Sequence, residues 1–350
     1  MRLGLNLGYW GMGNDADNLE LAQEAERLDF DVVWAAEAYG SDAATVLTWI
    51  AAHTSTIDVG AAIFQIPART PAMTAMTAAT LDTLSKGRFR LGLGASGPQV
   101  SEGWHGVRYA KPLGRTREYV QVVRQALSHE RVVFDGEHFT LPLPDGPGKA
   151  LKMIIHTVRP ADEMPIYLAA VGPKNLEVAG ELFDGWHAIF FSPTKGDLSL
   201  DRIRAGRDKV GKTMDGFDCN ATVPIGFGDD LEKLAEPIRA YAALYVGGMG
   251  SREKNFYNDL AHRLGYGEQA DRVQDLYLSR RQGEAMAAVP FEFIDETSLI
   301  GDVDRVADRM QAFRDAGVTT LSLSSYAGDL ETRRQELRTA AEAADKAGVL

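Results

Sequence analysis

Cysteine is almost absent from this chain, since Cys219 is the single one among 350 residues. One thiol can form neither an intrachain disulfide nor a cysteine-based metal cluster, and a chain without disulfides suits a reducing cytosol. Long apolar runs are missing as well: no stretch approaches the roughly 18 apolar residues that cross a bilayer. Residues 1–18 also lack the apolar run of a signal peptide. We therefore expect a cytoplasmic protein with no membrane partner.

An excess of positive charge is missing too. The formal net charge is −12, so the protein repels phosphate backbones and nucleic acid is not an expected partner. No set of His, Asp and Glu residues shows a recognisable metal-ligand spacing, so we expect no metal. A local basic pocket for one phosphate-bearing cofactor is still compatible with this overall charge.

Short apolar or β-branched runs alternate with longer amphipathic runs along most of the chain. Such alternation predicts parallel strands joined by crossover helices, and eight strand–helix units suggest a closed barrel. The length fits one enlarged barrel of this kind. The predicted fold is a TIM (β/α)8 barrel in a single domain, 1–350, with strands at residues 3–8, 31–36, 57–64, 89–93, 165–170, 187–191, 219–226 and 319–324.

Two stretches interrupt this alternation and are predicted to be insertions. Residues 131–162 contain VVFDGEHFTLPLP, which indicates a hairpin that turns at Asp135-Gly136. Residues 247–297 add helical patterns before the eighth strand, whereas 231–246 is expected to be the outer helix of the seventh unit. Barrel active sites are built from the loops that follow the strands. The insertions therefore either cover the active site or only pad or dimerise the fold.

The most informative region runs from Ile57 to Gly106. The third strand ends in small residues, Ala61 and Ala62, which let a flat ring approach the backbone closely. The fourth strand ends in GLGASG, whose bare amides can hold a phosphate or ring oxygens. This is not a Rossmann fingerprint, because Pro98 and a polar segment follow where a helix should open. The alternative is that these glycines only serve strand packing.

The run LDTLSKGRFRLGLG, with the preceding IPARTP, resembles the luciferase-like monooxygenase superfamily. The continuation GASGPQVSEGWHG resembles a subgroup of actinobacterial proteins that use the deazaflavin coenzyme F420, as do AEAYGSDAATVLTW, AAVGPKNLEVAGELFDGW and LYVGGMGSREKNFYNDLAHRLGY. The resemblance covers nearly the whole chain. It implies the bacterial luciferase-like barrel, an oxidoreductase activity and coenzyme F420, with FMN as the alternative cofactor, and it identifies no substrate.

The resemblance also implies where the cofactor lies. In the family, a non-proline cis peptide bond follows strand three behind the central ring, and the matching bond here joins Ala62 and Ile63. The loops after strands four and five line the ribityl chain and the phosphate of the cofactor. The matching residues here are Gly94, Ala95, Ser96 and Gly97 in the first loop, and Ala170, Val171, Gly172, Pro173 and Asn175 in the second.

The second of these loops also fits a phosphate on physical grounds. PIYLAAVGPKN is typical of a strand, a tight turn and a helix N-terminus, where free amides and the helix dipole attract a phosphate. Lys174 either adds charge there or is an ordinary solvated lysine. Luciferase has an arginine near the position of Ala95, and its absence here leaves the backbone amides as the substitute.

Glu37, at the end of the second strand, is the predicted catalytic residue. The resemblance carries this assignment, because deazaflavin-dependent relatives often have an acid or a histidine there that contacts the ring or shuttles a proton. A sugar-phosphate dehydrogenase of the superfamily has Asp-His where this chain has Glu37-Ala38, which argues against the same substrate. The alternative is a structural carboxylate paired with an arginine. Asp42 is predicted to be the N-cap of the following helix.

Three aromatic residues are assigned to the substrate pocket: Trp10 after the first strand, Tyr39 after the second and Trp104 after the fourth. For Trp10, a packing role is the alternative. His105 follows Trp104 and is placed near the cofactor ring, although a lone loop histidine is more often a surface or hydrogen-bonding residue. The same alternative applies to His187.

These features together lead to one main hypothesis and two alternatives. The main hypothesis is an F420-dependent oxidoreductase that transfers a hydride between the deazaflavin and a small organic substrate, for which the protein supplies a dry pocket and a proton donor. One alternative is an FMN-dependent two-component monooxygenase on the same barrel. The other is a non-catalytic cofactor-binding barrel whose insertions bind a partner. Relatives are often dimers, so a homodimer is expected.

Overall fold

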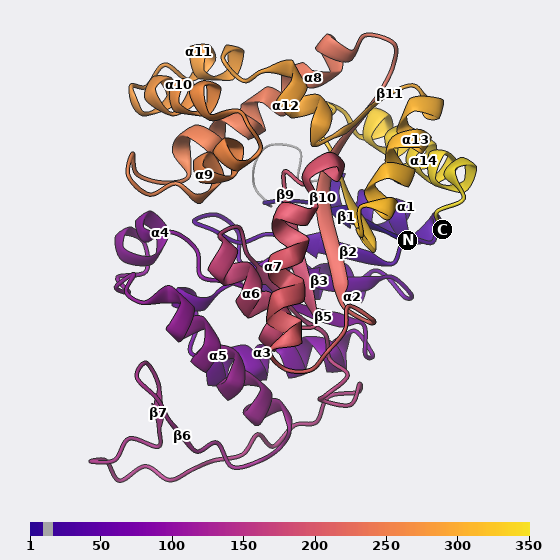
Figure 1. Cartoon of the computed structure of the whole chain (residues 1–350). Helices are drawn as coiled ribbons and strands as arrows, with labels where there is room; N and C mark the ends of the chain where they lie inside the picture. Colours follow the sequence, from indigo (N-terminus) through magenta and orange to yellow (C-terminus); the bar gives the residue numbers. More distant parts are fainter. Residues whose placement is uncertain (10–16) are drawn as a thin grey trace.

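The computed structural model describes residues 1–9 and 17–350, and within them eight parallel strands close into a barrel (Figure 1). The pairings of β9 with β10 and of β10 with β12 complete the ring. This arrangement confirms the predicted (β/α)8 fold and all eight predicted strands. The barrel strands are β1 (Arg2–Asn6), β2 (Val32–Ala35), β3 (Asp58–Ala61), β5 (Phe89–Gly94), β8 (Ile166–Ala169), β9 (Gly185–Ile189), β10 (Asp218–Phe227) and β12 (Thr320–Ser325).

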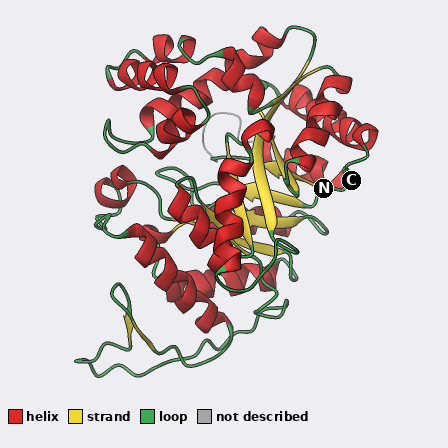
Figure 2. Cartoon of the chain, viewed as in Figure 1, coloured by secondary structure: helices red, strands yellow, loops and turns green. Residues whose placement is uncertain are grey.

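Helices surround this barrel, as the red ribbons around the yellow strands in Figure 2 show. Their apolar faces are buried against the strands, which is what amphipathic repeats between strands predict. Local chemistry sets their starts: Thr70, for example, accepts a hydrogen bond from the Met73 amide. The outer helices are α1 (Asn18–Arg27), α2 (Ala43–Ala52), α3 (Pro71–Leu84), α5 (Pro112–Leu127), α6 (Pro173–Leu182), α7 (Asp197–Asp208), α13 (Val303–Asp315) and α14 (Leu330–Ala347).

The second insertion is longer than predicted, because α8 belongs to it. The helix at 231–246 was expected to cover the barrel, but its buried residues join a second hydrophobic cluster with the inserted helices. The outer position is taken by α13, which packs beside α14 and buries its apolar face in the main core. The inserted elements are α8 (Leu231–Ala243), η4 (Leu244–Gly248), α9 (Phe256–Arg263), α10 (Gly267–Leu278), α11 (Gln282–Ala287), α12 (Phe291–Glu296) and β11 (Leu299–Gly301).

This insertion lies over the end of the barrel where the strands finish (Figure 1). Phe190, directly after β9, is part of the insertion's hydrophobic cluster, and Val171 and Tyr326, which follow β8 and β12, pack against it. The loops at this end form the active site in barrels of this type. The insertion is therefore placed to cover the site rather than to pad a remote face.

The first insertion is an extended arm at the opposite end of the molecule (Figure 1). It contains the predicted hairpin, in which β6 (Phe134–Asp135) pairs antiparallel with β7 (Thr140–Leu141). The carboxylate of Glu118 on α5 ties the turn to the barrel by accepting the backbone amides of residues 137, 138 and 139. The arm therefore lies away from the strand ends that carry the predicted cofactor residues.

A buried histidine lies inside the barrel. The ring of His187 on β9 lies 4.6 Å from that of Trp34 and 5.0 Å from that of Tyr167. Asn220 donates from its amide nitrogen to Nδ1 of His187 over 2.8 Å, while its amide oxygen accepts the Ser322 hydroxyl. His187 is therefore a neutral hydrogen-bonded core residue, which is the alternative that the sequence left open.

Candidate functional site

The end of strand three has the backbone that the family resemblance implied. The peptide bond between Ala62 and Ile63 is cis, as predicted. The short strand β4 (Phe64–Gln65) follows it and pairs with β5. The Ile63 side chain lies over Gly94, where an added Cβ would approach the isoleucine Cδ1 to 2.8 Å. The end of strand three and the end of strand four, which both carry predicted cofactor residues, are therefore in contact.

The predicted loops after β5 and β8 lie side by side, because these two strands are neighbours in the barrel. An added Cβ on Gly94 would lie 3.7 Å from the Ala169 Cβ at the end of β8. Ser96 adopts a left-handed conformation with a φ of 59°, which re-aims the backbone after the strand. The chain then enters a short helix at once, α4 (Pro98–Gly103). The expectation of a non-helical segment after the fourth strand was therefore wrong, because Pro98 takes the first helical position, where it needs no amide proton.

The loop after β8 begins the longer helix α6, as predicted. Gly172 is the N-cap residue and supplies no side-chain cap, and an added Cβ there would meet nothing within 4 Å. The side-chain oxygen of Asn175 is buried without a hydrogen-bond partner among the described residues. Lys174 is exposed to solvent. A polar ligand would find space beside the Gly172 backbone and a hydrogen-bond acceptor without a partner in the Asn175 side-chain oxygen.

A cation that the sequence did not indicate also reaches this loop. Arg263, on α9 of the second insertion, donates to the backbone oxygen of Val171 over 2.9 Å. Burial lowers the pKa of Arg263, against the opposing attraction of Asp259. A positive charge in partly dehydrated surroundings attracts anions strongly. The two residues are 92 positions apart in the chain, so no local motif could have linked them.

Beside this loop the structure has a small, partly open pocket between the ends of β8 and β9 and the second insertion. Its walls are mainly apolar. Lys195 lines it, but its ammonium already donates to the Leu264 carbonyl and lies 3.6 Å from the Glu296 carboxylate. The lining residues are Ala170, Val171, Trp186, Ile189, Phe190, Phe191, Ser192, Lys195, Gly196, Leu198, Ser199, Leu260 and Leu264.

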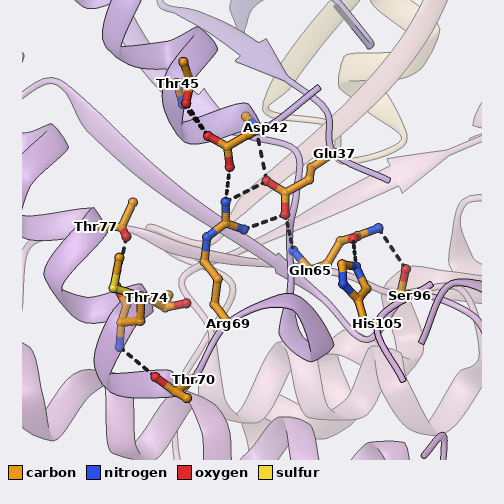
Figure 3. A network of polar contacts seen from close by, with 12 residues as sticks. Glu37, Asp42, Thr45, Gln65, Arg69, Thr70, Thr74, Thr77, Ser96 and His105 are labelled. Atoms are coloured by element: carbon orange, nitrogen blue, oxygen red, sulfur yellow. Dashed lines mark hydrogen bonds and ion pairs between the residues drawn. The ribbon is translucent and has the colours of Figure 1, made fainter. Parts of the chain in front are cut away.

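Glu37 is held in an ion pair (Figure 3). Arg69 donates to both carboxylate oxygens of Glu37, over 2.5 and 2.9 Å. The same oxygens accept the backbone amides of Ala43 at 3.2 Å and Gln65 at 3.4 Å. The Glu37 side chain is only 7% exposed. The pairing with an arginine, which the alternative interpretation expected, is therefore observed, while the catalytic role of Glu37 stays a prediction.

Asp42 completes this ion-pair cluster. It is the N-cap of α2, as predicted, and accepts the Thr45 amide over 2.8 Å. Its other oxygen contacts Arg69 (Figure 3). Although burial opposes the charged guanidinium, the hydrogen bond and charge of Glu37 raise the pKa of Arg69 above its ordinary value. The cluster thus holds the loop after β2, the segment at and after β4 and the start of α2 relative to one another.

A second polar chain runs from this cluster toward the loop after β5. Gln65 is 1% exposed. Its amide nitrogen donates to the Ser96 hydroxyl over 3.2 Å, and its amide oxygen lies 2.8 Å from Nε2 of His105 (Figure 3). In this arrangement Nε2 of His105 donates to the amide oxygen of Gln65. The structure thus brings His105 to the predicted site and holds it by a buried partner.

The aromatic residues predicted to line the substrate pocket do not form an enclosed pocket among the described residues. Tyr39 is 59% exposed and Trp104 is 65% exposed, so neither is enclosed by neighbouring side chains. Trp10 lies outside the described residues. Instead, the structure places several half-buried tyrosines at the end of the barrel, on segments to which the sequence assigned no pocket role.

Comparisons with known proteins agree with this geometry. The family model of luciferase-like monooxygenases matches residues 10–320. A protein of Mycobacterium tuberculosis with the provisional name of coenzyme F420-dependent oxidoreductase is 43% identical, over 93% of this chain and 95% of its own length. The 5,10-methylenetetrahydromethanopterin reductase of Archaeoglobus fulgidus is 30% identical, over 87% of this chain and 88% of its own length.

Solved structures show the same fold. The coenzyme F420-dependent tetrahydromethanopterin reductase of Methanopyrus kandleri aligns with a TM-score of 0.83 at 24% identity, over 99% of this chain and 98% of its own. Among the described residues, no helix is long and apolar enough to cross a membrane. The barrel, the strand ends and the match along most of the sequence lead to one conclusion: the chain belongs to the luciferase-like monooxygenase family.

Proposed function

We propose that this protein is a coenzyme F420-dependent oxidoreductase that transfers a hydride between the deazaflavin and a small organic substrate. The observation that carries the proposal is the 43% identity, over almost the full length of both chains, to the Mycobacterium tuberculosis protein named for that activity. The archaeal reductase at 30% identity supports it, because methylenetetrahydromethanopterin reduction is also a two-electron reaction.

The residues at the strand ends fit such a cofactor. Its phosphate suits the N-terminus of α6, where the positive end of the helix dipole and Arg263 both attract an anion. The unpartnered oxygen of Asn175 is an acceptor and suits a ribityl hydroxyl rather than the phosphate. Ile63 and Gly94 offer a compact apolar surface for the ring.

The chain's own residues bind and orient, while the deazaflavin supplies the hydride chemistry when it is bound. Glu37 was predicted to handle a proton, but all its hydrogen bonds serve Arg69 and two backbone amides. We therefore propose that Glu37 is a positioning residue for the strand ends. The second insertion lies over this end of the barrel (Figure 1), and we propose that it limits the access of bulk water to the site.

Fluorescence titration with purified F420 tests the proposed function, with FMN as the competing ligand. We expect saturable F420 binding, and at least tenfold weaker binding for Asn175→Leu, because a ligand hydroxyl then loses its buried acceptor. Lys174→Ala is the matched control one residue earlier and should change little, since Lys174 is exposed. Tight FMN binding without F420 binding would instead support the two-component monooxygenase.

We also propose the homodimer. The arm presents exposed apolar side chains, among them Leu143 at 70%, Leu151 at 75% and Ile154 at 89% exposure. Apolar surface of this kind on a folded chain commonly marks an association site. Sedimentation velocity should show a dimer, and replacing these three residues by serine should shift it to monomer. A wild-type monomer at micromolar concentration would contradict the proposal.

A further inference from the structure

A group of tyrosines gathers at the end of the barrel that carries the cofactor residues. We define the tyrosine cluster as Tyr9, Tyr241, Tyr245, Tyr257 and Tyr326. Ring centroids lie 4.7 Å apart for 241 and 245, 5.5 Å for 241 and 326, and 4.9 Å for 245 and 257, and the hydroxyls of 9 and 245 lie 3.4 Å apart. The first follows β1, the last follows β12 and the other three come from the second insertion.

The described neighbours of this cluster are mainly aromatic. Burial raises the pKa of Tyr241 and Tyr245 well above the ordinary value. Burial likewise raises the pKa of Tyr257 and Tyr326. In every case the groups that add to this effect are other tyrosines, and no carboxylate, ammonium or guanidinium is among them. The neighbours that act on these phenols are therefore mainly aromatic.

Three of the phenols also lack partners. Tyr241, Tyr257 and Tyr326 are half-buried, and their hydroxyls form no hydrogen bond with the protein within residues 1–9 and 17–350. None of the three hydroxyls is a fully enclosed atom without a partner, so each faces space that solvent or a ligand oxygen can reach. Unused donors on an apolar wall beside a cofactor site are what a ligand oxygen would satisfy.

Two cations near this end of the barrel contact groups outside the tyrosine cluster. Arg263 donates to the loop after β8, and Lys195 contacts the Leu264 carbonyl and the Glu296 carboxylate. Among the described residues, no cation lies over a ring of the tyrosine cluster, so a phosphate or carboxylate bound against these rings would lose hydration without a direct ion pair, which is unfavourable. Neutral rings gain instead, because flat apolar faces stack against aromatic side chains.

We propose that the tyrosine cluster is the substrate-binding wall, and that the substrate is an uncharged, mainly apolar ring compound with a carbonyl or hydroxyl oxygen. The proposal rests on the proposed function only in taking this end of the barrel as the active site. The ring packs against the aromatic faces, and the oxygen accepts a hydrogen bond from Tyr241 or Tyr326.

Binding of two size-matched probes tests this inference without turnover. The probes are 1-tetralone, a neutral bicyclic ketone, and 1-naphthoate, a bicyclic carboxylate, each titrated by calorimetry against protein with and without F420. We expect 1-tetralone to bind at least tenfold more tightly than 1-naphthoate. Equal or tighter binding of 1-naphthoate overturns the proposal.

Variants then locate the binding surface. At least one of Tyr241→Phe and Tyr326→Phe should weaken 1-tetralone binding about three- to tenfold, which is the loss of one hydrogen bond, and both should leave F420 affinity unchanged. Tyr266→Phe is the matched control, because its hydroxyl donates to Glu296 outside the cluster. Unchanged 1-tetralone affinity in both cluster variants, with their thermal unfolding intact, overturns the assignment. Failure of F420 to bind, with 1-tetralone still bound, rejects the proposed function alone.

Discussion

Replacing Arg69 by methionine is expected to lower the free energy of unfolding by about 3–5 kcal/mol, the range for removing one partner of a buried ion pair. The guanidinium is 13% exposed and the Glu37 carboxylate 7% exposed, so solvent screens this pair weakly. Without Arg69, Glu37 keeps only two backbone amide donors. Urea unfolding followed by circular dichroism measures the change.

The matched control is the double variant Arg69→Met with Glu37→Gln. Because the carboxylate that stays behind, Asp42, is 47% exposed and no buried charge is left unpaired, we expect it to recover a large part of the lost stability. A loss below about 1 kcal/mol for Arg69→Met alone would show that the pair contributes no more than an exposed salt bridge does.

The single variant Glu37→Gln separates the two roles considered for this carboxylate. A positioning role predicts lower stability and weaker F420 binding, but an unchanged shape of the pH–rate profile. A proton-handling role predicts a folded, cofactor-binding protein in which one limb of that profile is lost.

The stability of the protein is expected to fall by roughly 3 kcal/mol between pH 6.5 and pH 4 because of His187 alone. Burial lowers the pKa of this residue from 6.5 to about 4, against a weaker opposing attraction from Asp218. The unfolded chain therefore takes up a proton near pH 6.5 that the folded protein accepts only near pH 4. Unfolding is favoured across this window, and each pH unit contributes about 1.4 kcal/mol.

His187→Gln isolates this contribution from the carboxylates that titrate in the same range. The variant will be less stable at pH 7, because the contact with Asn220 and the rings of Trp34 and Tyr167 is disturbed. Between pH 6 and 4.5, its free energy of unfolding should nevertheless decline less steeply with falling pH than that of the wild type. The difference in slope should be at most that of one bound proton, about 1.4 kcal/mol per pH unit. Parallel curves would mean that His187 titrates normally in the folded protein.

The sequence by itself determined the barrel. Eight apolar runs separated by amphipathic repeats were enough to predict it. Strands of a parallel sheet are buried on both faces, so their sequences are almost continuously apolar. The Asp42 N-cap also followed from local chemistry. The cis bond between Ala62 and Ile63 is different: it was implied by the resemblance, since nothing in the local residue types requires it.

Only the tertiary structure decided the details of the site. Glu37 and Arg69 lie 32 positions apart, and the tyrosine cluster joins segments from both ends of the chain and from the second insertion. Sequence patterns report periodicity within one element, whereas a site at a barrel end is assembled from the loops of several strands. The same limit explains α8, whose amphipathic pattern showed that it packs but not whether it packs on the barrel or on its neighbours in the insertion.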